Sequence, residues 1–171
     1  MGRGGPEHQY LQELVKRWGE AKGYRATVEE PLPGGGRADV ALRREGYSLA
    51  CEISITSTVE QEVGNVVKCL AAGFSEVVLV SLKKTRLARV RQALADRLPP
   101  EDAGRVPFLA PEELSFLLEA RGAPAETTET VSGYRVKVEY EKPDEAARAS
   151  RARAIADLIA RRMKETKRGE P

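Results

Sequence analysis

The sequence predicts a mixed α/β domain in which helices flank a β-sheet. Segments with helical spacing alternate with short strand-like segments up to Gly122. One of these, Glu76–Ser81 (EVVLVS), is apolar almost throughout, as expected for a central strand covered on both faces. Glu45-Gly46 separates two segments of alternating polarity and predicts a tight hairpin turn. Together these patterns favour a sheet built around a hairpin.

The composition is that of a globular protein. Of the 171 residues, 41% are hydrophobic and 32% are charged, which suits one domain or one domain with an appendage. The 28 Lys and Arg residues nearly balance the 26 Asp and Glu residues. Bulk charge therefore points to no particular partner, and any nucleic-acid surface must be a local patch.

The cysteine and hydropathy patterns limit the possible cellular location and the possible metal sites. Cys51 and Cys69 lie in apolar surroundings and are expected to be reduced core residues. A single histidine and the lack of a CxxC motif exclude an ordinary zinc site. No apolar run approaches the length of a membrane span, and the start lacks a signal-peptide pattern. We therefore expect a cytoplasmic protein that does not enter a membrane.

The first elements are a helix and a strand. The segment Glu7–Lys22 has an apolar stripe at helical spacing, and Gly23 ends it. Tyr24–Val28 is expected to be a strand, and the prolines and glycines of residues 31–36 a loop. The stripe comprises Tyr10, Leu11, Leu14, Val15 and Trp18.

The hairpin follows, and its turn sets the register. With Glu45-Gly46 as a two-residue turn, Asp39 faces Glu52, on the side of the sheet opposite its most apolar face. Like charges opposed across strands are destabilising unless something compensates them, and a divalent cation between the two carboxylates would do so. The other facing pairs are Arg44 with Tyr47, Leu42 with Leu49, and Val40 with Cys51.

Helices and strands then alternate up to Gly122. Thr58 and Gln61 form a predicted capping box that opens a helix ending at Gly73. The strand Glu76–Ser81, a helix over 83–98 and a short strand Val106–Leu109 follow. The last helix of this part starts at Pro111 and runs to about Ala120. The inward residues of the first of these helices are expected to be Val59, Val63, Val66 and Leu70.

The character of the chain changes after Gly122. Residues 123–133 are polar and are expected to be extended or loop-like, and Tyr134–Tyr140 alternates as a strand does. A long basic amphipathic helix is predicted from Asp144 to about Lys167. We divide the chain into a core of residues 1–122 and an appendage of residues 123–171. The appendage is expected to pack on the core or on a protein partner.

The hairpin carries a resemblance. A helix, a strand, a hairpin bearing Asp and then Glu, a helix and an apolar strand, with Arg37-Ala38-Asp39-Val40 and Cys51-Glu52-Ile53-Ser54, resemble the PD-(D/E)xK nucleases. This superfamily has the restriction-endonuclease-like fold, and the resemblance covers roughly residues 7–110. It implies an α-β-β-β-α-β core and a site in which Asp39, Glu52 and the backbone carbonyl of Ile53 ligate Mg²⁺ or Mn²⁺.

The sequence departs from the family at one position. The family places a lysine two residues after the Glu, where this chain has Ser54, a neutral hydroxyl. Some members move the lysine to the following helix, which makes Lys68 the candidate here. The helical angle argues against Lys68, because the inward positions of that helix lie on nearly its opposite side.

Other residues are candidates with an ordinary alternative beside each. Glu7 or Glu13 could add a metal ligand from the first helix, although a surface glutamate is the commoner reading. His8 could act as a base, but a lone histidine near a chain start is more often a surface residue. Basic side chains could contact nucleic acid or simply form a solvated face. Those proposed for such contact are Arg37, Lys83, Lys84 and Arg86.

Three functions remain open from the sequence. The first is a metal-dependent nuclease acting on DNA, which requires the two carboxylates to share a cleft with basic rims. The second is a degenerate nuclease fold that binds nucleic acid or protein without cutting, which the absent lysine favours. The third is a protein-interaction domain that docks through residues 123–171. The whole chain also resembles nuclease-like modules of helicases or DNA-transfer ATPases, and the family often forms homodimers. A generic α/β domain with solvated carboxylates is the plain alternative.

Overall fold

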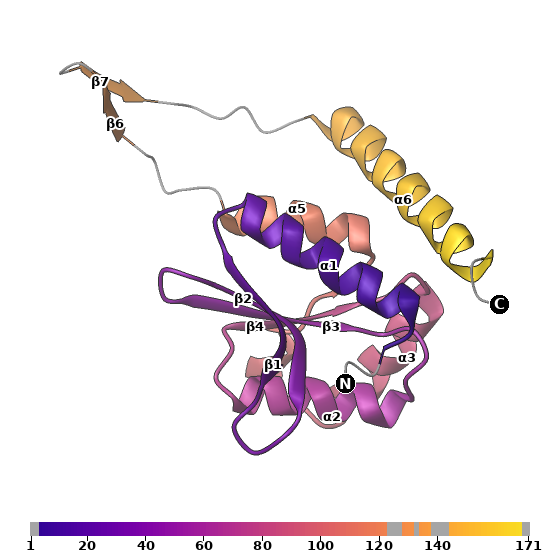
Figure 1. The fold of residues 1–171 in the computed structure, drawn as a ribbon. Coiled ribbons are helices and arrows are strands. Elements are labelled where there is room, and N and C mark those ends of the chain that lie inside the picture. The colour runs from indigo at the N-terminus through magenta and orange to yellow at the C-terminus, as the bar shows by residue number, and fades with distance from the viewer. Residues whose placement is uncertain (1–3, 123–127, 132–133, 138–143, 169–171) are drawn as a thin grey trace.

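The computed structural model describes residues 4–122, 128–131, 134–137 and 144–168. The sheet in its centre has five strands in the order β1-β2-β3-β4-β5 (Figure 1). The strands β1 (Arg25–Pro31), β2 (Arg37–Arg44) and β3 (Tyr47–Ile53) are antiparallel neighbours. The strands β4 (Glu76–Val80) and β5 (Phe108–Leu109) join β3 in parallel. The predicted mixed sheet is confirmed.

The β2–β3 hairpin has the predicted register. Val40 pairs with Cys51, Leu42 with Leu49, and Arg44 with Tyr47. Glu45 and Gly46 have φ angles of 40° and 79°. Positive φ at both central residues is the signature of the type I′ turn, whose twist matches that of the strands it connects. A local turn rule therefore determined which residues share each face of the sheet.

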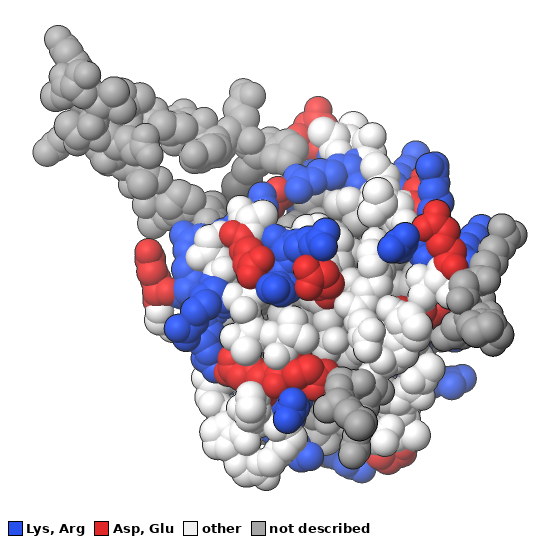
Figure 2. Space-filling model, in the orientation of Figure 1, with Lys and Arg blue, Asp and Glu red and all other residues white. Residues whose placement is uncertain are grey.

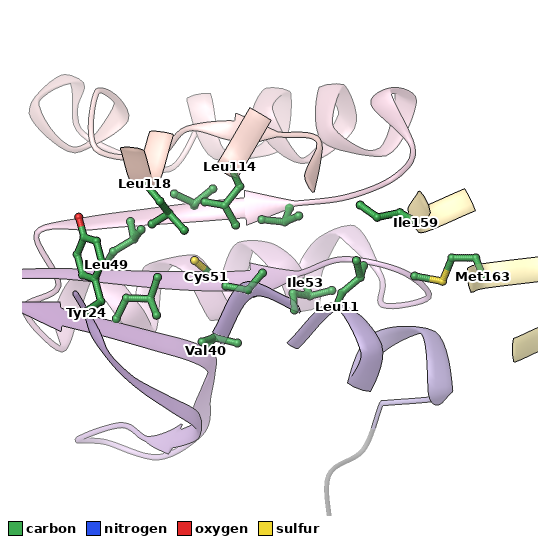
Figure 3. Close-up of a cluster of buried hydrophobic side chains, with 14 residues drawn as sticks. Leu11, Tyr24, Val40, Leu49, Cys51, Ile53, Leu114, Leu118, Ile159 and Met163 are labelled. Atoms are coloured by element: carbon green, nitrogen blue, oxygen red, sulfur yellow. The ribbon is translucent and has the colours of Figure 1, made fainter. Parts of the chain in front are cut away.

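One face of the sheet is covered by the helices α1 (Pro6–Ala21), α5 (Pro111–Gly122) and α6 (Glu145–Arg168) (Figure 1). The cluster beneath them includes Val40 and Cys51 from the hairpin, Leu114 from α5 and Ile159 from α6, all buried (Figure 3). Each Val, Leu or Ile side chain among them contributes about 1.5–3 kcal/mol when it is fully buried. This is the most apolar face, as the alternation of the strands predicted.

The opposite face is covered by α2 (Val59–Ala71) and α3 (Lys84–Ala95). The capping box predicted at Thr58 and Gln61 is present at the start of α2. The buried side of α2 differs from the predicted one, because Val59 and Leu70 are only half-buried. The helix is rotated so that polar side chains face the end of β3. Its buried residues are Glu62, Val63, Val66 and Cys69.

Some element boundaries differ from those predicted from the sequence. The strand β1 continues to Pro31, whose missing N–H is tolerated because β1 is an edge strand. The strand β5 comprises only Phe108–Leu109, and an additional short helix, α4 (Pro100–Ala103), follows Pro99. Proline at the first helical position favours such a turn.

The segment after Gly122 contains two strands. The strand β6 (Thr128–Val131), in a region expected to be extended or loop-like, pairs antiparallel with β7 (Tyr134–Lys137). They form a separate two-stranded sheet that lies away from the central sheet (Figure 1). The rest of the strand predicted up to Tyr140 lies outside the described residues.

Helix α6 packs on the core. Ile159 and Met163 are buried against the α1–α5 face, and Leu158, on the outer side, is 59% exposed. The guanidinium groups of Arg148 and Arg151 lie over the ring of Phe116, 5.2 and 5.6 Å from its centroid. Within the described parts of the chain, no helix is both long and apolar enough to cross a bilayer.

Candidate active site

The β2–β3 ladder opens just beyond the Val40–Cys51 pair, and carboxylates replace backbone carbonyls there. The N–H of Asp39 donates to Oε1 of Glu52 at 3.3 Å. The N–H of Ile53 donates to Oδ2 of Asp39 at 2.7 Å. Each N–H is thus satisfied by a side chain instead of a ladder partner. The structure brings together the two carboxylates that the register predicted to face each other.

Glu52 is buried and incompletely paired. Its side chain is fully buried, and its Oε1 also accepts a hydrogen bond from Sγ of Cys69 at 3.3 Å. Its Oε2 has no hydrogen-bond partner among the described residues. Burial, and then the neighbouring charge of Asp39, raise the pKa of Glu52 to about 8, against the lowering effect of its hydrogen bonds. An unpaired buried carboxylate oxygen carries a desolvation cost that a bound cation or proton would remove.

Asp39 is held from the other side by α1. Nε2 of His8 lies 3.1 Å from Oδ2 of Asp39, and the two side chains are 16% and 19% exposed. Burial alone would lower the pKa of His8, but the hydrogen bond to Asp39 and the charges of Asp39, Glu29 and Glu62 outweigh it and raise that pKa. Nε2 of Gln12 donates to the carbonyl of Asp39 at 3.3 Å and to Glu29 at 2.7 Å.

The interpretation of His8 as a surface residue was wrong, because the side chain is mostly buried against Asp39. A signal for this placement was present in the sequence. His8 and Gln12 are four residues apart and therefore lie on one side of the helix, next to the buried Leu11 and Val15. Polar residues that continue a buried stripe need partners, and here the partners come from β1 and β2.

An open cavity of about 1040 Å³ lies beside this network. Asp39 and Ile53 line it at the end of the hairpin, and His8 lines it from α1. Its lining is strongly acidic, and Arg37 is the one Lys or Arg among the described lining residues. The basic rim that the nuclease hypothesis requires is therefore not part of this cavity. The carboxylates that line it are Glu7, Glu29, Asp39 and Glu62.

Glu62 is a second residue that the sequence analysis missed. It is 2% exposed, lines the cavity from α2, and accepts a hydrogen bond from the hydroxyl of Ser57. Its charge contributes to the raised pKa values of both His8 and Glu52. In the predicted orientation of the helix, Glu62 lies at the margin of the buried face centred on Val63 and Val66. In the folded protein, the helix turns Glu62 toward the end of β3.

Ser54, where the resemblance to PD-(D/E)xK nucleases leads one to expect a lysine, is a buried hydroxyl. Ser54 is fully buried, and its N–H donates to the carbonyl of Val80 at 2.8 Å. The Oγ of Ser54 has no hydrogen-bond partner among the described residues. Lys68 is exposed and lies beside Gly36, where an added Cβ would be 3.6 Å from its Nζ. Lys68 is not among the residues that line the cavity.

The remaining predicted residues do not all lie at the acidic cavity. Glu7 and Arg37 line the acidic cavity. Glu13 instead forms an exposed ion pair with Arg17 at 3.0 Å. Lys83 and Arg86 line a second, smaller cavity, whereas Lys84 is exposed at the start of α3 and does not line it.

The donor set fits a hard cation that keeps several waters. Within the described residues, no three His, Cys, Asp or Glu side chains converge as the ligands of a closed metal cage do. Mg²⁺ does not need such a cage, since it binds through one or two carboxylates and retains water. Asp39, Glu52 and the carbonyl of Ile53 would be that kind of donor set, and the unpaired Oε2 of Glu52 is an observation that fits it.

Comparisons with known proteins provide little beyond this geometry. No family model matches the chain, and no curated protein matches it in sequence. Among solved structures, it is similar to the crystal structure of the small subunit of the heterodimeric restriction endonuclease R.BspD6I. The two are 12% identical, the match covers 95% of this chain and 90% of that chain, and the TM-score is 0.44. A similarity at this level assigns no function.

Proposed function

We propose that this chain is a DNA-processing domain that hydrolyses phosphodiester bonds with a divalent cation. The observation that supports this proposal is the opening of the β2–β3 ladder at Asp39 and Glu52. It leaves Oε2 of the buried Glu52 without a hydrogen-bond partner among the described residues, and Asp39 and Ile53 beside it line an acidic cavity of about 1040 Å³. An acidic cavity repels a phosphate unless a cation neutralises it, so a metal ion and the substrate would bind together.

Each residue of the site would have a separate role in the reaction. Asp39, Glu52 and the carbonyl of Ile53 would hold Mg²⁺ or Mn²⁺, which supplies charge neutralisation and a water of lowered pKa. His8 holds the Asp39 carboxylate in place through Nε2. Ser54 cannot supply the positive charge of a lysine, so any charge next to the phosphate must come from elsewhere.

A second candidate is a nuclease-like fold that binds without cutting. It is favoured by the complete burial of Glu52, whose raised pKa keeps the carboxyl largely protonated at pH 7, and by the neutral Ser54. A protonated carboxyl is a poor ligand for Mg²⁺. Under this alternative the polar network would only maintain the end of the hairpin.

Calorimetric titration with Mg²⁺ and Mn²⁺ separates the two candidates. We expect binding by the wild type and none by the Asp39→Asn/Glu52→Gln double variant, together with cleavage of plasmid or branched DNA by the wild type alone. Binding without cleavage would favour the second candidate. Cleavage that survives in the double variant would refute the proposed site, and far-ultraviolet circular dichroism would show that the variant is folded.

A further inference from the structure

A second cavity lies next to the acidic one and has the opposite charge. Its volume is about 340 Å³, and Lys83, Arg86 and Arg89 from the start of α3 line one wall. Ser57 and Thr58, before α2, line the other wall. Among the described lining residues there is no carboxylate, whereas the larger cavity has four. Ser57 lines both cavities, so they share a wall.

The three cations of this basic cavity are not neutralised within the described part of the chain. No described carboxylate forms an ion pair with Lys83, Arg86 or Arg89. Arg86 donates through Nη1 to the carbonyl of Ser57, which fixes the guanidinium against the wall that the cavities share. The other N–H groups of that guanidinium have no partner that the structure shows, and a fixed fork of donors suits phosphate oxygens.

The charge pattern of α3 is the reverse of what a helix start favours. Its N-cap is Lys83, no side chain caps the free N–H groups, and its first turn has no acidic residue. The start of a helix carries partial positive charge, so acidic side chains stabilise it and cationic side chains are repelled by it. The cations and the helix start therefore both favour an anion in this cavity.

We propose that the basic cavity binds a phosphate of the same nucleic-acid strand whose neighbouring phosphate lies in the acidic cavity, with the strand crossing at Ser57. The proposal rests on the proposed function for the identity of the polymer, and it supplies the positive charge that the acidic cavity lacks. It separates the basic residues of α3 by role. Lys83, Arg86 and Arg89 are assigned to the phosphate site, and Lys84 is assigned to the solvated surface.

The test is nucleic-acid binding measured by fluorescence anisotropy over a series of salt concentrations. The probes are a short labelled single strand and the matching duplex, with EDTA present so that no divalent cation contributes. The test variant is Lys83→Gln/Arg89→Gln, which spares the Arg86 hydrogen bond and thus the local fold. The matched control is Lys84→Gln/Arg97→Gln, which removes the same charge from two exposed residues outside the cavity, one in α3 and one just after its end.

We expect the test variant to bind at least roughly tenfold more weakly than the control. The slope of log affinity against log salt is negative, and its magnitude should fall by roughly one to two, because each lost phosphate contact reduces that magnitude by about 0.7–0.9. Equal weakening in both variants, or none in either, would show a solvated basic face and overturn the proposal. Inorganic phosphate that competes as well as the oligonucleotide would reduce the site to a free-anion site and overturn the proposed strand path.

The Asp39→Asn/Glu52→Gln variant distinguishes failure of this proposal from failure of the proposed function. Binding through the basic cavity should persist in that variant, because neither substituted residue lines it. Loss of cleavage with intact, cavity-dependent binding would support the phosphate site whatever the catalytic role of the carboxylates. Cleavage by the wild type with equal binding by the test and control variants would support the function and refute the strand path.

Discussion

The backbone N–H of Asp39 donates to the side chain of Glu52, and the side chain of Asp39 accepts from the backbone of the next residue, Ile53. The two carboxylates therefore complete the strand pairing themselves at the point where the ladder opens. This arrangement explains how two acidic residues can face each other in a folded hairpin. The charge of Asp39 is compensated by the N–H of Ile53 and by His8. The charge of Glu52 is reduced by protonation, because burial raises the pKa of this carboxyl.

The pH dependence of stability is the first prediction. The pKa of Glu52 is raised from 4.5 to about 8, so the folded state keeps a proton that the unfolded state loses between these values. Stability must then fall as the pH rises through this window. We expect Glu52→Gln to be more stable than the wild type at pH 8 by roughly 2–4 kcal/mol, and nearly equal to it at pH 4.5. Urea unfolding at the two pH values measures this, and a pH-independent difference would contradict it.

Divalent cations should offset the stability that is lost when the buried Glu52 ionises at high pH. A cation that binds the folded state alone stabilises it by an amount set by its concentration relative to its Kd, about 2.7 kcal/mol at one hundred times Kd. We expect Mg²⁺ or Mn²⁺ to raise the Tm of the wild type more at pH 8 than at pH 5, because a proton competes for Glu52 at the lower pH. Glu52→Gln is the control, and an equal rise of its Tm would contradict the site.

His8 should make stability depend on pH in the same direction, but by adding stability at low pH. Its pKa is raised in the folded state, so its contribution is complete below its ordinary value of 6.5 and is lost as the pH rises through the folded value. We expect His8→Gln to cost about 1 kcal/mol at pH 5.5 and less at pH 9. Thermal unfolding at both pH values measures the difference. His8→Gln should also reduce cleavage, since the Asp39 carboxylate loses the contact of the His8 ring at Oδ2.

Two helical glycines make a matched pair for the packing of α1. A Cβ on Gly19 would lie 2.5 Å from Cδ2 of Leu42, whereas a Cβ on Gly64 would meet nothing within 4 Å. We expect Gly19→Ala to destabilise the protein by about 1–3 kcal/mol through overpacking. Gly64→Ala should be neutral or stabilise α2 by roughly 0.5–1 kcal/mol. Equal effects in denaturant titrations would mean that α1 does not pack so closely on β2.

Several features of the fold could be predicted from the sequence because local rules control them. The turn at Glu45-Gly46 requires positive φ angles, and this requirement set the hairpin register and the proximity of Asp39 and Glu52. The capping box at Thr58 placed the start of α2, and the apolar Glu76–Val80 segment marked an interior strand of the sheet. The strand β6 was not identified, because a polar, threonine-containing segment becomes a strand only when it has a partner such as β7.

The surroundings of the two carboxylates were decided by the tertiary structure. Asp39 meets His8 across 31 positions of sequence, and Glu52 meets Cys69 across 17. Glu62 faces the cavity because of how α2 is rotated on the sheet. The spacing of apolar residues in α2 predicts that rotation only approximately. Local sequence is enough to specify the hairpin and the facing pair of acids, since a turn and an alternating strand are governed by neighbouring residues. Only the packing of α1 and α2 across the sheet decided their burial and partners, because those contacts depend on how distant elements fit together.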